Sequence, residues 1–173
     1  MMLALLAVLL ALPAHAKVHY ARDEALTLVF PDAEVAARTV ILSEAEAAAI
    51  EERTGKPVAS KLVTYHEARR DGSVVGYGII DMHVVRTLPE AILVVLTPAG
   101  TIEQVLLLAF QEPPEYAPSE RWLRQFDGRG IETTGWRVGR DLHGISGATL
   151  TAYAVAGTVR RAVALFDLVI RSR

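Results

Sequence analysis

The stretch Ala91-Ile92-Leu93-Val94-Val95-Leu96-Thr97 decides the fold of this chain. Its five central residues are apolar without interruption, which is typical of a strand that is covered on both faces. The turn sequence Pro98-Ala99-Gly100 follows it, and residues 101–110 form a second apolar segment. A connection of this length cannot contain a crossover helix, so the two strands must be antiparallel.

Another pair of strands precedes this one. Residues 61–69 and 73–84 flank Asp71-Gly72, a dipeptide that favours a hairpin turn. In the second of these strands, Gly76 and Gly78 expose the backbone, so that a helix or a ligand can approach it closely. The four segments together predict an antiparallel β-sheet.

Helical segments lie on both sides of these strands in the sequence. Residues 22–30 form a short amphipathic helix. Ser43-Glu44-Ala45-Glu46 is a capping box, and it begins a helix that ends at Gly55. Ser119 caps a third, short helix. Residues 133–140 are expected to be extended.

The last helix is expected to begin at Thr149 or Leu150 and to end near Ile170. Apolar residues recur along it at helical spacing and form a stripe that faces the core. The stripe consists of Val155, Val159, Val163, Phe166 and Ile170. We therefore predict an α+β fold in a single domain, with an antiparallel β-sheet and helices packed on it.

The N-terminal sequence MMLALLAVLLALPAHA reads as a secretory signal peptide. Its apolar run is shorter than the roughly 20 residues that cross a bilayer. Pro13 ends this run, and Ala14-His15-Ala16 has the form of a cleavage site. We predict a signal peptide at residues 1–16, a domain at residues 17–173, and a periplasmic or otherwise exported protein. An uncleaved membrane anchor and a buried N-terminal helix are the alternatives.

The composition excludes several kinds of partner and cofactor. The 173 residues carry a formal net charge of −2 and no Cys. This near-neutral balance does not indicate nucleic-acid binding, which requires a basic surface. Without Cys, the chain has no disulfide, no Cys-ligated iron–sulfur cluster and no c-type haem. Redox chemistry would therefore require an organic cofactor or a site built from His and carboxylates.

The segment His143-Gly144-Ile145-Ser146-Gly147-Ala148-Thr149-Leu150-Thr151 is the densest cluster of Gly, Ser and Thr in the chain. The small residues Gly147 and Ala148 leave space, and Ser146 and Thr151 add hydroxyl groups. Because a helix follows, its free N–H groups and the positive end of its dipole favour an anion such as phosphate here. The alternative is that the cluster only caps the helix.

Within this segment, Ser146-Gly147-Ala148-Thr149 resembles the attachment motif of the FMN-binding domain family. That family includes the flavin subunits of the Rnf complex and of the sodium-pumping NADH:quinone reductase. Other parts of the chain resemble exported members of the family. These parts are Phe30-Pro31-Asp32-Ala33, residues 76–87, Glu112-Pro113-Pro114-Glu115-Tyr116 and residues 122–126.

The resemblance implies that Thr149 carries FMN through a phosphoester bond, which an FMN transferase forms. It also implies a set of cofactor-binding residues in the motif, in its flanks and in two upstream segments that form a wall near the flavin. This set consists of Thr149, Ser146, Gly147, Ala148, Leu150, Thr151, His143, Glu112, Tyr116 and Trp122.

One position departs from the family pattern. Relatives carry an Asp three residues before the Ser of the motif, where this chain has His143, and the nearest Asp is Asp141. In the family, that acidic residue belongs to the sequence that the transferase recognises. The departure implies either a transferase that tolerates His or a less efficient modification. His143 could itself hydrogen-bond the cofactor and change its charge near neutral pH.

The resemblance favours an exported flavoprotein that transfers electrons between redox partner proteins or within a membrane electron-transfer complex, rather than an enzyme with an organic substrate. A non-covalent FMN-binding, sensory or adaptor module without its own turnover is the second interpretation. A third, a serine hydrolase, rests on Gly144-Ile145-Ser146-Gly147-Ala148, which approximates a nucleophile elbow, but no His follows it in the chain.

Some polar residues outside the motif have more than one interpretation. Arg86 could pair with a carboxylate such as Glu90 or with a phosphate. His66 and His83 are expected to be surface or hydrogen-bonded histidines, and their spacing matches no metal-ligand motif. Arg160 and Arg161 are expected on a solvated helix face or at a docking patch for a redox partner.

Overall fold

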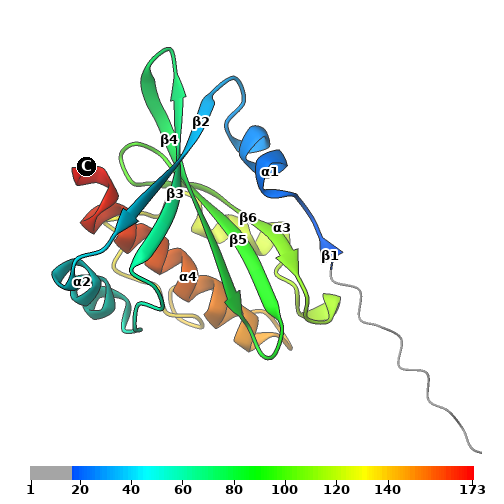
Figure 1. Cartoon of the computed structure of the whole chain (residues 1–173). Coiled ribbons are helices and arrows are strands. Elements are labelled where there is room, and N and C mark those ends of the chain that lie inside the picture. The colour runs from blue at the N-terminus through cyan, green and yellow to red at the C-terminus, as the bar shows by residue number, and fades with distance from the viewer. Residues whose placement is uncertain (1–16) are drawn as a thin grey trace, which may run out of the picture.

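The computed structural model describes residues 17–173, and the predicted signal peptide at residues 1–16 lies outside them. A six-stranded antiparallel sheet forms the centre of the molecule, in the order β1-β6-β5-β4-β3-β2 (Figure 1). The strands are β1 (Lys17–Val18), β2 (Glu34–Ile41), β3 (Leu62–Arg70), β4 (Ser73–Val84), β5 (Pro89–Leu96) and β6 (Ile102–Phe110). The predicted α+β fold with an antiparallel sheet is confirmed.

Four α-helices and three short 3₁₀ turns complete the described chain. They are α1 (Arg22–Val29), α2 (Glu44–Thr54), η1 (Pro114–Tyr116), α3 (Glu120–Leu123), η2 (Arg124–Phe126), α4 (Thr149–Leu168) and η3 (Ile170–Ser172). The predicted capping box of α2 is confirmed, since Ser43 and Glu46 exchange side-chain and backbone hydrogen bonds, and Gly55 ends the helix at a φ of 70°. Among residues 17–173, no helix combines the length and hydrophobicity needed to cross a membrane.

The two faces of the sheet carry different helices, and β5 is buried between them (Figure 1). Residues 92–96 of β5 are all 0% exposed. Ile92 and Val94 pack in the cluster that contains α2, α3 and α4, whereas Leu93 and Val95 pack in the cluster that contains α1. This alternation confirms the prediction of a central strand covered on both faces.

The glycines of β4 admit α1 rather than a ligand. A Cβ atom at Gly76 would lie 2.7 Å from Cε1 of Phe30, and one at Gly78 would lie 3.2 Å from Cδ2 of Leu26. The helix therefore approaches the sheet closely only because these two positions have no side chain. This placement resolves the two alternatives that the sequence left open for the exposed backbone.

The strands β3 and β4 separate part of the way along their length. Their ladder extends from the pair His66 and Gly78 to the pair Arg70 and Ser73. Beyond it, residues 62–65 pair with β2, and residues 79–84 pair with β5. We call this divergence the fork, and Figure 1 shows α4 behind it.

Residues 133–140, which were expected to be extended, belong to no strand. Val138 makes one isolated bridge with Leu142, residues 139 and 140 form a turn, and the rest of the segment has no regular secondary structure. A side chain from outside the segment holds it in place, since the guanidinium of Arg129 donates to the carbonyl oxygens of Gly135 and of the following residue Asp141.

Candidate functional site

The Thr149 hydroxyl lies at the start of α4, where the helix is open to solvent. Ala148 is the N-cap residue and offers no side-chain acceptor to the first turn. Gly147 precedes it with a φ of 76°, a left-handed conformation that favours glycine. Thr149 is exposed, and Leu150 is 54% exposed. The sequence thus places a nucleophilic hydroxyl and uncapped helix amides at an accessible surface.

A pocket of 190 Å³ lies beside this helix start. It is lined by residues 147–151, by Arg86 from the turn between β4 and β5, and by Tyr116 from η1. Of the residues that the sequence predicted as cofactor-binding, residues 147–151 and Tyr116 therefore line one pocket. Arg86 was not in that set, although a phosphate was one of the two partners expected for it.

Arg86 and Tyr116 contact each other at the edge of this pocket. The guanidinium carbon of Arg86 lies 5.3 Å from the centroid of the Tyr116 ring, a cation–π geometry. The carboxylate considered for Arg86 from the sequence, Glu90, instead pairs with His83. The contact leaves the positive charge of Arg86 facing the pocket that Thr149 also lines.

Glu112 holds the turn that carries Arg86. Its Oε1 accepts hydrogen bonds from the backbone N–H groups of Arg86, Thr87 and Leu88, at 3.1, 2.7 and 2.9 Å. The hydrogen bonds from Thr87 and Leu88 lower the pKa of the Glu112 carboxyl, although burial opposes them. Glu112 is thus a positioning residue for the β4–β5 turn, and it does not line the pocket as the sequence prediction implied.

Trp122 and His143 connect the pocket region to α3. The indole Nε1 of Trp122 donates to the carbonyl oxygen of His143 at 2.9 Å, and the N–H of His143 donates to Oε1 of Gln125 at 2.8 Å. Both bonds use the backbone of His143, and its side chain is exposed. The two predicted residues therefore support the loop before the motif, and neither lines the pocket.

Asp141 does not take the place of the missing acidic residue. Its Oδ2 accepts from the N–H of Arg137 at 2.9 Å, and its Oδ1 accepts from Nε of Arg140 at 3.1 Å. Both oxygens therefore belong to the turn that precedes the motif.

Ser146 and Thr151 differ in their surroundings. Ser146 is exposed and does not line the pocket, whereas Thr151 is 1% exposed and does. The sheet is antiparallel throughout, and in residues 17–173 no histidine hydrogen-bonds to Ser146. The surroundings of Ser146 give no support to the interpretation as a nucleophile elbow, which requires a parallel sheet and a histidine base.

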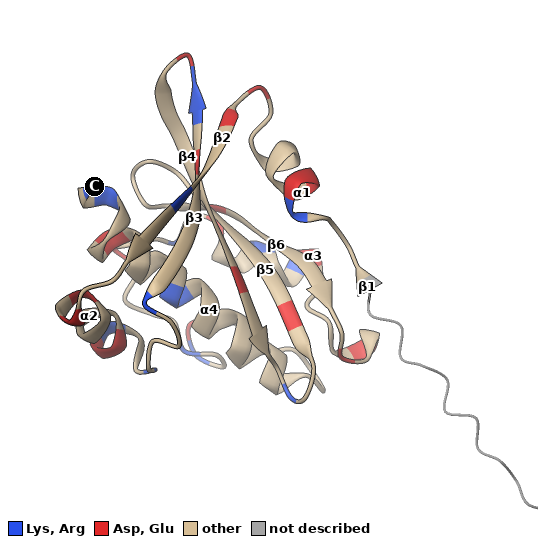
Figure 2. Cartoon of the chain, viewed as in Figure 1, with Lys and Arg blue, Asp and Glu red and all other residues tan. Residues whose placement is uncertain are grey.

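A second polar cluster lies between the middle of α4 and the sheet, and Figure 2 shows its acidic positions on β4 and β5. His83 is its centre: Nδ1 lies 3.1 Å from Oδ1 of Asp81, and Nε2 lies 3.0 Å from Oε2 of Glu90. Arg161 donates from Nη2 and Nε to Oδ2 of Asp81, at 2.6 and 3.2 Å. Thr158 Oγ1 lies 3.2 Å from Nδ1 of His83.

The charges in this cluster stabilise one another. Burial by itself would lower the pKa of His83, but hydrogen bonds and negative charge from Asp81 and Glu90 outweigh burial and raise that pKa to about 9. Glu90 is 0% exposed, and its Oε1 has no hydrogen-bond partner among the described residues. Arg161, which was expected on a solvated helix face or at a docking patch, is only partly solvated: its side chain is 30% exposed, and its guanidinium forms an ion pair with Asp81.

A comparison with protein-family models gives no match, and a comparison with curated proteins gives none either.

Proposed function

We propose that this chain is an exported flavoprotein that carries FMN through a phosphoester to Thr149 and transfers electrons between redox partner proteins. The observation that carries the proposal is the pocket at the start of α4, where Thr149, Arg86 and Tyr116 meet. The choice of FMN as the cofactor rests on the similarity of Ser146-Gly147-Ala148-Thr149 to the attachment motif of the FMN-binding domain family.

The residues of the pocket fit the phosphate end of FMN. Arg86 offers a positive charge, and the first turn of α4 offers backbone N–H groups and the positive end of the helix dipole. The volume of 190 Å³ is below the roughly 300–1,000 Å³ that buries a whole drug-sized ligand. The phosphate end suits a volume of this size, and the larger ring system would remain at the surface.

Exposed apolar side chains beside Thr149 are available to such a ring. Leu150 and Tyr153 are 54% and 52% exposed, and Tyr153 follows Thr149 by one helical turn. Tyr153 was not among the predicted residues, although its spacing of four from Thr149 could have identified it. Aromatic and aliphatic side chains in these positions favour contact with a flat, largely apolar ring.

When bound, FMN supplies one- and two-electron redox chemistry, and the protein residues bind it, orient it and set its surroundings. A covalent bond prevents loss of the flavin from an exported protein. The partners that follow from this proposal are an FMN transferase and redox proteins, including those of a membrane electron-transfer complex.

Intact mass tests the attachment. The chain is expressed with and without an FMN transferase, and the modified protein is expected to gain the mass of FMN less one water. Thr149→Ala is expected to abolish the gain and Thr149→Ser to retain it, because only the hydroxyl is required. Ser73→Ala, which removes an exposed hydroxyl outside the motif, is the control. Flavin that stays bound to Thr149→Ala after denaturation would overturn the assignment.

The alternative function is a module that binds FMN without a covalent bond. It is favoured by His143, which stands where the family has an acidic residue, and by Asp141, whose carboxylate is used by its own turn. For such a module, purified protein would be yellow, and acid precipitation would release all of its flavin into the supernatant.

A further inference from the structure

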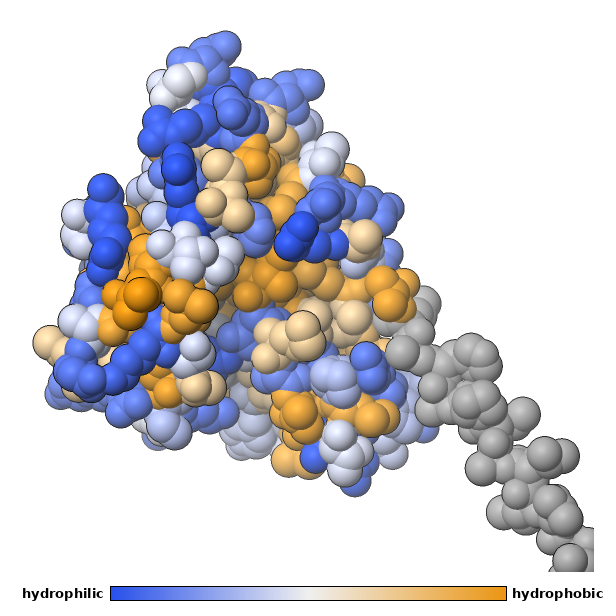
Figure 3. All heavy atoms as spheres, viewed as in Figure 1, coloured by the Kyte–Doolittle hydropathy of each residue, from blue (hydrophilic) through white to orange (hydrophobic). Residues whose placement is uncertain are grey.

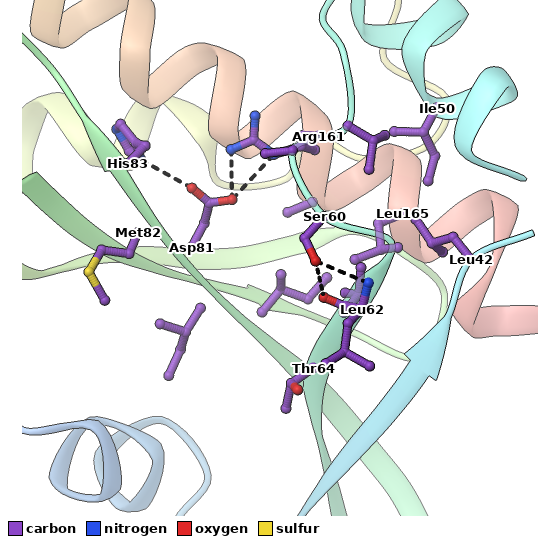
Figure 4. Close-up of a pocket in the computed structure, with 16 residues that line it drawn as sticks. Leu42, Ile50, Ser60, Leu62, Thr64, Asp81, Met82, His83, Arg161 and Leu165 are labelled. Atoms are coloured by element: carbon purple, nitrogen blue, oxygen red, sulfur yellow. Dashed lines mark hydrogen bonds and ion pairs between the residues drawn. The ribbon is translucent and has the colours of Figure 1, made fainter. Parts of the chain in front are cut away.

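The fork between β3 and β4 encloses a cleft of 460 Å³, which we call the fork cleft (Figure 4). Its floor is apolar, with Ala162 and Leu165 from α4 and Ile50 from α2. At its rim, Leu62 is 60% exposed and Met82 is 74% exposed. Figure 3 shows apolar side chains gathered on this face of the molecule. The volume lies within the range of roughly 300–1,000 Å³ that is usual for ligand sites.

The walls of the fork cleft are strand edges without a partner. Residues 62–64 of β3 and residues 79–83 of β4 line the two sides, and in the described ladders neither segment pairs across the fork. Such edges present alternating backbone N–H and C=O groups, which another extended chain can pair with. Because β3 and β4 run in opposite directions, an inserted chain can be antiparallel to only one of them. The longer free edge, that of β4, is the better template.

One end of the fork cleft carries Arg161, an ion-paired arginine with hydrogen-bonding capacity left over. Arg161 uses Nε and Nη2 for Asp81, and Nη2 also reaches Thr158 Oγ1 at 3.2 Å. Among the described residues, its Nη1 has no hydrogen-bond partner, and the side chain is 30% exposed. Asp81 and Glu90 balance the charges of Arg161 and His83, so this cluster as a whole is neutral, and the free hydrogen-bonding capacity of this end is that of Nη1 of Arg161. Because a guanidinium N–H group forms its strongest hydrogen bonds with ionised acceptors, a carboxylate is the favoured complement of Nη1.

We propose that the fork cleft binds the carboxyl-terminal end of a partner polypeptide with apolar side chains. Its terminal carboxylate pairs with Nη1 of Arg161, and its last apolar side chain lies on Ala162 and Leu165. Its backbone pairs with the free edge of β4, and upstream residues contact the exposed rim at Leu62 and Met82. The proposal uses no residue of the Thr149 pocket, so it is independent of flavin attachment.

Calorimetry with synthetic peptides tests the proposal on the full domain. The probe is N-acetyl-Ala-Val-Leu with a free carboxylate, and its matched control is the same peptide with a C-terminal amide. The amide is expected to bind about tenfold more weakly or worse, because it lacks the charge that Arg161 recognises. A peptide extended at its N-terminus by ten Gly and Ser residues is expected to bind as tightly as the probe, because the chain of a partner protein also continues beyond the bound residues.

Two variants locate the binding. Arg161→Gln is expected to reduce the affinity for the acid about tenfold and to leave that for the amide unchanged, whereas Arg160→Gln should leave both unchanged. Leu62→Asp places a negative charge at an exposed rim position, where folding is not at risk, and is expected to weaken binding of the acid. Thermal melts confirm that each variant is folded.

Four outcomes would overturn the proposal. They are no binding of the acid at millimolar concentration, equal binding of acid and amide, loss of binding on N-terminal extension, and binding of decanoate as tightly as the peptide acid. The last result would identify a site for acyl chains, because decanoate has the carboxylate and an apolar body but no backbone amides.

Discussion

The helix α4 contacts polar groups at two places, which differ in how much hydrogen-bonding capacity remains free for a ligand. In its middle, Thr158 and Arg161 are joined to Asp81, His83 and Glu90, so that most hydrogen-bonding capacity is used inside the protein. At its first turn, the N-cap has no polar side chain, and the hydroxyl of Thr149 is exposed. The first place stabilises the fold, and the second retains its capacity for a ligand.

The largest effect is expected from removing the centre of the buried cluster. His83→Ala leaves the carboxylate of Glu90 without its hydrogen-bond donor in a site that is 0% exposed. Breaking a buried ion pair by removing one partner typically costs about 3–5 kcal/mol. Urea unfolding at pH 7 measures this loss in the free energy of unfolding.

The matched control is His143→Ala, which removes an exposed imidazole near the Thr149 pocket. Its effect on the free energy of unfolding is expected to stay within about 0.5 kcal/mol. Equal losses for the two variants would mean that the buried cluster and the helix start do not differ in the way proposed.

The next largest effect is a dependence of the free energy of unfolding on pH, through the titration of His83. The pKa of His83 is about 9 in the folded protein and 6.5 as its ordinary value, so its protonation stabilises the folded state. Because the folded pKa is the higher one, this stability is fully present below pH 6.5 and is lost as the pH rises through 9. The shift corresponds to roughly 3 kcal/mol.

Unfolding measured at intervals between pH 6 and pH 10 tests this dependence. The wild-type protein should lose stability over this range, and His83→Gln, which cannot titrate, should lose much less. Parallel curves for the two proteins would show that His83 is not the titrating group.

A smaller effect is expected at the turn that carries Arg86. Glu112→Gln keeps an oxygen that can accept from the backbone N–H groups of residues 86–88 but removes its negative charge. Neutral hydrogen bonds are weaker than charge-assisted ones, so the Tm should fall by about 2–4 °C. Calorimetry measures this, with Glu115→Gln, an exposed neighbour, as the control that should not change.

The smallest effect on stability is expected at the proposed acceptor itself. Thr149→Ala should change the free energy of unfolding by less than about 0.5 kcal/mol, because the exposed hydroxyl has no structural partner in the described chain. Thr158→Ala, on the same helix, should cost about 1–3 kcal/mol, since its hydroxyl hydrogen-bonds within the buried cluster. Reversal of this order would contradict the comparison between the two places.

Local signals predicted most of the fold. The strands around Asp71-Gly72 are confirmed because the turn fixes its own geometry, with φ values of 50° and 78° at these residues. The helix caps at Ser43 and Ser119 likewise depend on residues within one turn. The short strand β1 was not predicted, since its two residues are too few to show an alternation of apolar and polar side chains, and they pair with the distant end of β6.

The functional regions depend on contacts between distant parts of the chain and were predicted only in part. Residues 147–151 and Tyr116 line one pocket as expected, whereas the place of Arg86 depends on Glu112, which lies 26 residues away in the sequence. The strand pattern of β4 also indicates the position of the buried cluster. Asp81 and His83 alternate in register with the core residues Tyr77 and Ile79, and thus had to face α4.

The order of the sheet has a consequence for how the protein assembles. From β2 to β6, each strand pairs with its neighbour in the sequence, and the connections between β3, β4, β5 and β6 are short, so these three ladders can form early. The final helix is the last long segment of the chain, and it must dock on the completed meander. The Thr149 pocket, the buried cluster and the floor of the fork cleft all include residues of this helix, so that each is complete only once the helix has docked. Under the proposed function, an FMN transferase would therefore meet the motif in its final surroundings only on chains whose folding is complete.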